Sequence, residues 1–155
     1  MLITLQYMSI SLYYRRHNAT GRVQDLNMAI KAGRSALQAL PHNHRYAPRY
    51  QTELASKLIP RFDKQGSLDN INEAVLLSTS AAVTASTPST ISNEDKSYSY
   101  RYTTLTQTLA KRFEKTEGEE DLEESIKYAR AAASAVNKPG VKLLERHTTH
   151  QNWQI

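Results

Sequence analysis

Apolar residues recur along this chain at the spacing of a single helix face. Leu105, Leu109 and Phe113 lie four residues apart, which places them in one stripe on an α-helix. A second stripe, earlier in the chain, consists of Leu26, Ile30, Gly33, Leu37 and Leu40, with Ala29 and Ala36 beside it. These patterns predict an all-α fold.

Three segments of the chain share one pattern. Each starts with an arginine and has an aliphatic residue ten positions later, a small residue after thirteen and a branched aliphatic residue after fourteen. The arginines are Arg16, Arg61 and Arg112, so the copies are offset by 45 and 51 residues. Agreement at several positions in three copies indicates an internal repeat.

Each copy is expected to form a hairpin of two helices. A glycine separates the two helical patterns, where a chain leaving a helix benefits from a residue that tolerates positive φ. These glycines are Gly21, Gly66 and Gly118, the last one position late, with Glu117 in its place. A proline closes each second helix, since proline cannot continue one; these are Pro41, Pro88 and Pro139.

The pattern predicts a single domain over residues 1–155. Its repeats cover approximately 1–45, 46–95 and 96–138, followed by a partial further helix over 140–155. The Ser/Thr-rich stretch 78–92 accounts for the longer second offset, and Pro60 is expected to kink its helix or force an early start. Residues 1–10 lack a charged leader, so we interpret them as the buried face of a helix rather than a signal peptide.

These residues resemble the tetratricopeptide repeat family. Its first helix carries a leucine, a small residue and then an aromatic residue, as in Leu109, Ala110 and Phe113. Its second helix carries two small residues seven apart and then a proline, as in Ala29, Ala36 and Pro41. The repeats here are longer than that family's, and this longer form resembles tandem arrays in fungal proteins that end in a caspase-like CHAT domain. The resemblance implies an α-α superhelix, or solenoid, of about three hairpins.

Composition changes the picture in two ways. The chain has no cysteine, which excludes disulfides, a thiol nucleophile and the His/Cys pair of a CHAT protease, and fits a cytoplasmic location. Net charge is uneven: residues 1–66 carry ten Lys and Arg against three Asp and Glu, giving +7, whereas residues 67–155 carry −2. One end of the chain is therefore basic and the other mildly acidic.

No catalytic constellation stands out from the sequence. His42 and His44, and His147 and His150, are the histidine pairs, and structural zinc needs four ligands. The acidic run 117–124 lacks the alternating oxygen spacing of a calcium loop and suits a helix N-terminus. We therefore expect no catalysis, no metal and no cofactor.

The resemblance implies a protein-binding scaffold whose first helices line a concave groove. Residues beside the stripes of those helices would face the groove and hold a partner's carboxylates. They are Arg15, Lys64, Gln107, Lys111 and Lys115.

Two other interpretations remain open at this level. The basic half could bind nucleic acid, with tyrosines such as Tyr98, Tyr100 and Tyr102 stacking on bases, although packing between helices is the simpler role for them. The chain could also be part of the regulatory array of a larger CHAT-type protein. Its open repeat ends offer a route to self-association.

Overall fold

The computed structural model describes residues 2–84 and 95–136, and within these two ranges the chain is helical and contains no strand. The predicted all-α fold is confirmed for this part of the chain. Six α-helices are formed: α1 (Leu2–Thr20), α2 (Val23–Ala39), α3 (Ala47–Gln65), α4 (Leu68–Val83), α5 (Asp95–Thr116) and α6 (Glu119–Val136).

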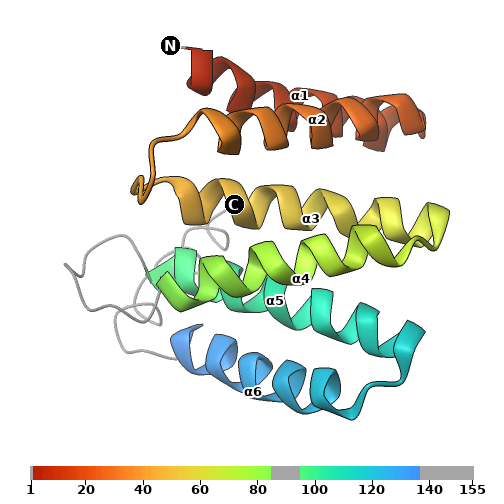
Figure 1. Cartoon of the computed structure of the whole chain (residues 1–155), viewed down its shortest axis with the longest axis vertical. Coiled ribbons are helices and arrows are strands. Elements are labelled where there is room, and N and C mark those ends of the chain that lie inside the picture. Colours follow the sequence, from red (N-terminus) through yellow and green to blue (C-terminus); the bar gives the residue numbers. More distant parts are fainter. Residues whose placement is uncertain (1, 85–94, 137–155) are drawn as a thin grey trace, which may run out of the picture.

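The helices follow one another along the long axis of the molecule, with α1 and α6 at opposite ends (Figure 1). Each helix packs against the helices before and after it, and α3 also contacts α5. Short turns join α1 to α2, α3 to α4 and α5 to α6. The 45-residue offset read from the sequence is reproduced by the backbone, since Leu2–Thr20 and Ala47–Gln65 differ by 45 at both ends.

The three turns have the same geometry. Gly21 and Gly66 adopt φ of 70° and 64°, and Glu117 adopts φ of 56° at the matching position. In each turn the amide of this residue donates a hydrogen bond of 2.7 Å to the carbonyl four residues earlier. The left-handed position of the third turn is therefore occupied by Glu117 and not by Gly118.

Apolar side chains fill the spaces between consecutive hairpins. One cluster joins α2, α3 and α4 and includes Leu26, Ile30, Leu54, Leu58, Phe62, Ile71 and Ala74. A second joins α4 and α5 and consists of Val75, Ala82, Leu105 and Leu109. Each large aliphatic side chain buried in this way stabilises the fold by about 1.5–3 kcal/mol.

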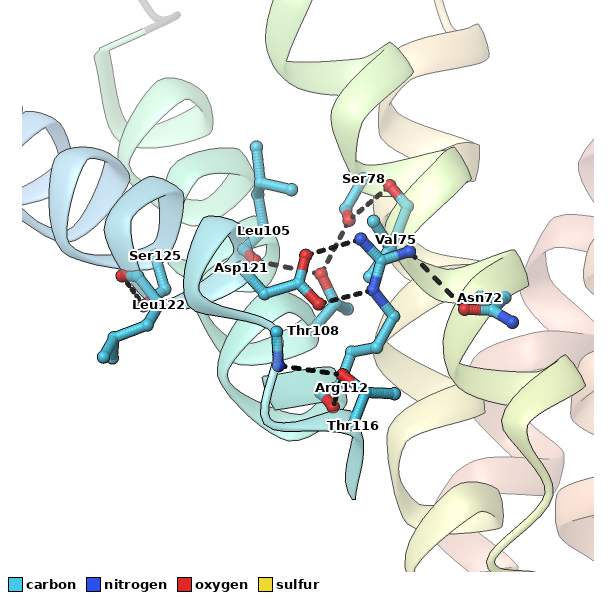
Figure 2. A network of polar contacts seen from close by, with 11 residues as sticks. Asn72, Val75, Ser78, Leu105, Thr108, Arg112, Thr116, Asp121, Leu122 and Ser125 are labelled. Atoms are coloured by element: carbon cyan, nitrogen blue, oxygen red, sulfur yellow. Dashed lines mark hydrogen bonds and ion pairs between the residues drawn. The ribbon is translucent and has the colours of Figure 1, made fainter. Parts of the chain in front are cut away.

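Small polar residues allow close approach between α4 and α5. The hydroxyls of Ser78 and Thr108 lie 2.9 Å apart, and both side chains are buried. One hydroxyl donates to the other (Figure 2), and the hydroxyl that accepts this bond donates to a carbonyl of its own helix, either Ser78 to Ala74 at 2.7 Å or Thr108 to Leu105 at 2.9 Å. The Ser/Thr-rich stretch thus begins as ordered helix, and its residues 85–92 lie outside the described part of the chain.

The N-terminal segment differs from the prediction. It is helical, but Leu2, Leu5, Met8 and Leu12 are exposed, whereas Ile10 is fully buried. The predicted buried face is therefore wrong for most of these residues, because α1 has neighbours on one side alone within the described chain.

The prolines differ in where they lie relative to the helices. α2 ends at Ala39, just before Pro41, as predicted. Pro60 lies inside α3, which begins at Ala47 and continues to Gln65, so this proline does not shift the start of the helix. Pro88, Pro139 and the predicted partial helix over 140–155 fall outside the described residues.

None of the helices in the described part of the chain has the length and apolar character that crossing a membrane requires.

Candidate functional site: the odd-helix face

The odd-numbered helices α1, α3 and α5 present one continuous set of polar side chains. On α3 this side carries Arg49, Glu53, Ser56, Asp63 and Lys64, at the spacing of a helix face. By the repeat offsets, Tyr100, Gln107 and Lys115 of α5 match Arg49, Ser56 and Lys64, and Arg15 of α1 and Lys111 of α5 both match Pro60, one turn before Lys64. We call this surface the odd-helix face.

Aromatic stacking joins α1 to α3 on this face. The rings of Tyr7 and Tyr50 are stacked with centroids 4.3 Å apart. Arg49 donates a hydrogen bond of 2.7 Å from Nε to the hydroxyl of Tyr7, and its guanidinium lies 5.0 Å from the centre of that ring. Burial raises the pKa of Tyr7, with a further contribution from the negative charge of Glu53. These contacts hold α1 against α3 and place the Arg49 guanidinium on this face.

A buried lysine reinforces the same junction. Lys57 is almost fully buried and lies 3.3 Å from the carboxylate of Glu53. Its ammonium also lies 4.1 Å from the ring centre of Tyr14 on α1. A carboxylate and an aromatic face compensate the charge in this partly desolvated position.

An ion pair joins α3 to α5. Lys111 lies 3.2 Å from Asp63 on α3 and 3.3 Å from Glu114 on its own helix. Asp63, followed by Glu114, raises the pKa of Lys111. This predicted partner-binding residue is thus already engaged within the molecule.

The other four predicted site residues lie at the surface. Arg15, Lys64, Gln107 and Lys115 are exposed, and no described residue forms an ion pair or hydrogen bond with their side chains. Lys64 and Lys115 occupy the same register position on α3 and α5. Their charges are available to an incoming carboxylate.

Tyr100 completes the face on α5. Tyr100 stays 43% exposed, and the burial of its remainder raises its pKa; the hydrogen bond with the Ser56 hydroxyl opposes this shift, and the charge of Glu53 adds to it. Sequence reasoning missed Tyr7, Arg49, Glu53 and Lys57. The repeat contained a signal for two of them. Arg49 and Glu53 hold the positions that Tyr100 and Thr104 hold one repeat later, so aligning the copies would have drawn attention to this side of the earlier helix.

A cleft of about 830 Å³ lies at the α2–α3 loop, where α2 and α4 end and α3 and α5 begin. Its walls include Leu40, His42, His44, Arg45 and Arg101. Among the described residues, no carboxylate lies within ion-pairing distance of either histidine, and no three His, Cys, Asp or Glu side chains gather as a metal site would require. His147 and His150 fall outside the described residues.

The arginines near the tyrosines mostly cover their rings. The guanidinium of Arg45 lies 4.6 Å from the centre of the Tyr46 ring, and that of Arg101 lies 5.6 Å from the Tyr98 ring. Tyr102 packs against Tyr128 of α6, with ring centres 5.8 Å apart. These contacts fit the predicted packing role of the tyrosines better than an open platform for stacking bases.

Comparisons with known proteins found no match: no protein-family model, no curated protein and no solved structure matches the chain.

Proposed function

We propose that this chain is a tetratricopeptide-like α-solenoid that binds an acidic protein segment along the odd-helix face. The observation that carries the proposal is the alignment of Arg15, Lys64 and Lys115, three exposed cations from three different helices, on one face. A linear array of charges on rigid helices favours an extended ligand with carboxylates at matching intervals. No catalytic step is part of this proposal.

Two features support a binding surface over a purely structural one. The side chains around the cations are held by contacts between helices, such as Arg49 to Tyr7 and Lys111 to Asp63. Preorganised groups lose little side-chain entropy on binding. The cations themselves, in contrast, have no partner among the described residues, which leaves their charge to a ligand.

The test uses synthetic peptides as probes. Short fluorescein-labelled peptides rich in Asp and Glu are titrated with the full chain, beside peptides in which each acid is replaced by its amide. Binding is followed by fluorescence anisotropy. The acidic peptides are expected to bind, and the amide peptides to bind at least about tenfold more weakly, a difference of about 1.4 kcal/mol.

A pair of double variants locates the site. Lys64→Ala with Lys115→Ala removes two cations from the odd-helix face without touching the Lys111–Asp63 pair. Lys31→Ala with Arg130→Ala removes the same charge from exposed positions on α2 and α6. The first variant should bind the acidic peptides about tenfold more weakly, and the second should bind them like the wild type. Equal loss in both variants would show that net charge alone drives binding.

Nucleic-acid binding is the second candidate, favoured by the charge of +7 on residues 1–66. A labelled oligothymidine added to the same titrations distinguishes it. Binding to this oligonucleotide with a steep loss as salt rises, and none to the acidic peptides, would support the nucleic-acid function instead.

The resemblance to fungal CHAT-type arrays suggests a setting for either activity, namely the regulatory portion of a larger protein. In that setting, the acidic segment bound by the odd-helix face would be the signal that regulates the larger protein.

A further inference from the structure

The two ends of the molecule expose apolar side chains that lie in helix stripes. On α1, Leu5, Met8 and Leu12 are 57%, 56% and 63% exposed. On α6, Leu122 and Ile126 are 39% and 45% exposed. Inside the molecule most of the matching positions are buried, and the residues that bury them show what these end faces are shaped to contact.

The α6 stripe includes a position whose counterpart on α4 packs on the next odd helix. Leu122 and Ile126 occupy the register positions of Ile71 and Val75 on α4, which are 0% and 7% exposed. Val75 packs in one cluster with Leu105 and Leu109 of α5. Ile126 therefore holds a position that contacts the next odd-numbered helix, whereas the counterpart of Leu122, Ile71, packs in the cluster of α2, α3 and α4.

The α1 stripe matches the side of an odd helix that packs on the preceding even helix. Leu12 of α1 occupies the register position of Thr108 of α5. Thr108 is fully buried and meets Ser78 of α4. The exposed face of α1 is thus equivalent to the face that α5 presents to α4.

Charges at the two ends complement each other in the same register. Lys111 of α5 pairs with Asp63 of α3, and the corresponding residues at the ends of the molecule are Arg15 on α1 and Glu114 on α5. The sign of each charge is kept, so these end residues are also a complementary pair.

A second contact repeats this relation. Arg112 of α5 donates a hydrogen bond of 3.4 Å to the side-chain oxygen of Asn72 on α4 (Figure 2). The matching end residues are Arg16 on α1 and Glu123 on α6. At the ends, the neutral oxygen acceptor is replaced by a carboxylate, which makes a stronger contact with arginine.

We propose that a second copy of this chain docks head to tail, the α6 end of one copy against the α1 end of the next. The junction would reproduce the α4–α5 contact, which in this register sets Ile126 against Ser9 and Tyr13, Leu12 against Ala129, and Glu123 against Arg16. The pair Glu114–Arg15 would reproduce the α3–α5 contact. The opposite charges of the two halves of the chain, +7 for residues 1–66 and −2 for residues 67–155, favour this arrangement over head-to-head pairing. Because the contact is heterologous, each copy keeps one open end and the assembly can grow beyond a dimer.

Sedimentation velocity on the full chain tests the proposal. The wild type is expected to shift to larger species as concentration rises, without stopping at a dimer. Leu12→Glu spoils only the α1 end, and Ile126→Glu spoils only the α6 end. Each variant alone should remain a monomer at concentrations where the wild type associates.

Mixing the two variants gives the decisive result. One intact α6 end from Leu12→Glu and one intact α1 end from Ile126→Glu can form a single junction, so the mixture should give a one-to-one dimer and nothing larger. Both residues are substantially exposed, at 63% and 45%, and far-UV circular dichroism checks that the variants stay folded. No dimer in the mixture, with wild-type helicity in both variants, would overturn the proposal.

A charge exchange tests the register. Arg15→Glu and Glu114→Arg should each weaken association by about tenfold, and the double variant should recover most of it because the pair is restored with reversed sign. A wild type that stays monomeric at all concentrations also overturns the proposal.

Discussion

The guanidinium of Arg112 donates two hydrogen bonds to the carboxylate of Asp121. Nε donates to one carboxylate oxygen at 2.7 Å and a terminal nitrogen donates to the other at 2.6 Å (Figure 2). Arg16 and Asp25 form the corresponding ion pair in the first hairpin, again nine residues apart. Each pair connects the end of an odd helix to the first turn of the following even helix, and so fixes the angle of the hairpin.

Removing the carboxylate of Asp121 is expected to destabilise the third hairpin. Asp121→Ala should lower the free energy of unfolding by about 1–3 kcal/mol, since it leaves a partly buried guanidinium without its ionic partner. Urea denaturation in dilute solution, followed by circular dichroism, measures the change. Glu123→Ala, which removes an exposed carboxylate two residues later, should change it by less than about 0.5 kcal/mol.

The second hairpin supplies a natural comparison. Asn70 takes the place of the aspartate, and both Arg61 and Asn70 donate to the side-chain oxygen of Gln65, at 3.2 and 3.3 Å. An amide therefore fits this position, and Asp121→Asn should lose less stability than Asp121→Ala. Equal losses would mean that charge alone, and not hydrogen bonding, matters at this position.

Asp25 makes stability depend on pH in acid. The hydrogen bond from Arg16 is the largest cause that lowers the pKa of Asp25, and the charges of Arg16, Arg22 and His17 act in the same direction. A carboxylate with a lowered folded-state pKa contributes stability above its unfolded pKa of about 3.9, and this contribution disappears as pH falls toward the folded value.

Comparison with Asp25→Asn isolates this contribution. The variant should melt at a lower temperature than the wild type at pH 7, and the difference should shrink steadily as pH falls below about 4. Thermal melts between neutral and strongly acidic pH check this, because every other carboxylate titrates in both proteins. A constant difference across this range would contradict the assignment.

Much of the fold could be predicted from the sequence because the repeat is encoded in local patterns. Apolar spacing predicts helices, and the shared register of Arg16, Arg61 and Arg112 marks the three hairpins. The left-handed turn position was also readable in the first two copies, where it is glycine. In the third copy residue type pointed to Gly118, whereas the hydrogen-bonded turn requires the left-handed residue at 117.

Glu117 is consequently a strained position that glycine should relieve. A side chain in the left-handed region costs roughly 1 kcal/mol, which glycine avoids. Glu117→Gly is therefore expected to raise the free energy of unfolding by about 0.5–1 kcal/mol, part of the gain being lost to a more flexible unfolded chain.

Gly66→Glu is the matched reverse change. A Cβ at Gly66 would have no atom within 4 Å, so the loss arises from the backbone conformation with φ of 64° and not from a clash. It should lower the free energy of unfolding by about 1 kcal/mol. Changes of the same sign in the two variants would show that side-chain contacts of Glu117, rather than its backbone, dominate.

The candidate site was less predictable than the fold. A single helix pattern places Lys111 and Lys115 on one side of α5, but it carries no information about which neighbour faces them. Asp63 is 48 residues before Lys111 and reaches it only through the packing of α3 on α5. The exposure of Leu5 and Leu12 has the same origin, since apolar residues indicate a contact surface and the sequence does not say whether the contacting element is present.

Gly33 on α2 illustrates how close packing overrides helix propensity. A Cβ at this position would lie 3.1 Å from Cδ1 and 3.4 Å from Cβ of Leu54, and 3.6 Å from Cδ1 of Ile10. Leu54 and Ile10 are almost completely buried, so neither can move aside freely. Alanine would gain about 1 kcal/mol in helix propensity but lose about 1–3 kcal/mol through overpacking.

Gly33→Ala is therefore expected to lower the free energy of unfolding by about 1 kcal/mol, although the same change stabilises most helices. The sign should reverse in the background of Leu54→Ala, because truncating Leu54 removes the obstructing Cδ1 and leaves space for the new methyl group. Urea denaturation of both single variants and the double variant gives the coupling between the two sites. If Gly33→Ala destabilises equally in both backgrounds, the contact with Leu54 is not the reason that glycine occupies this position.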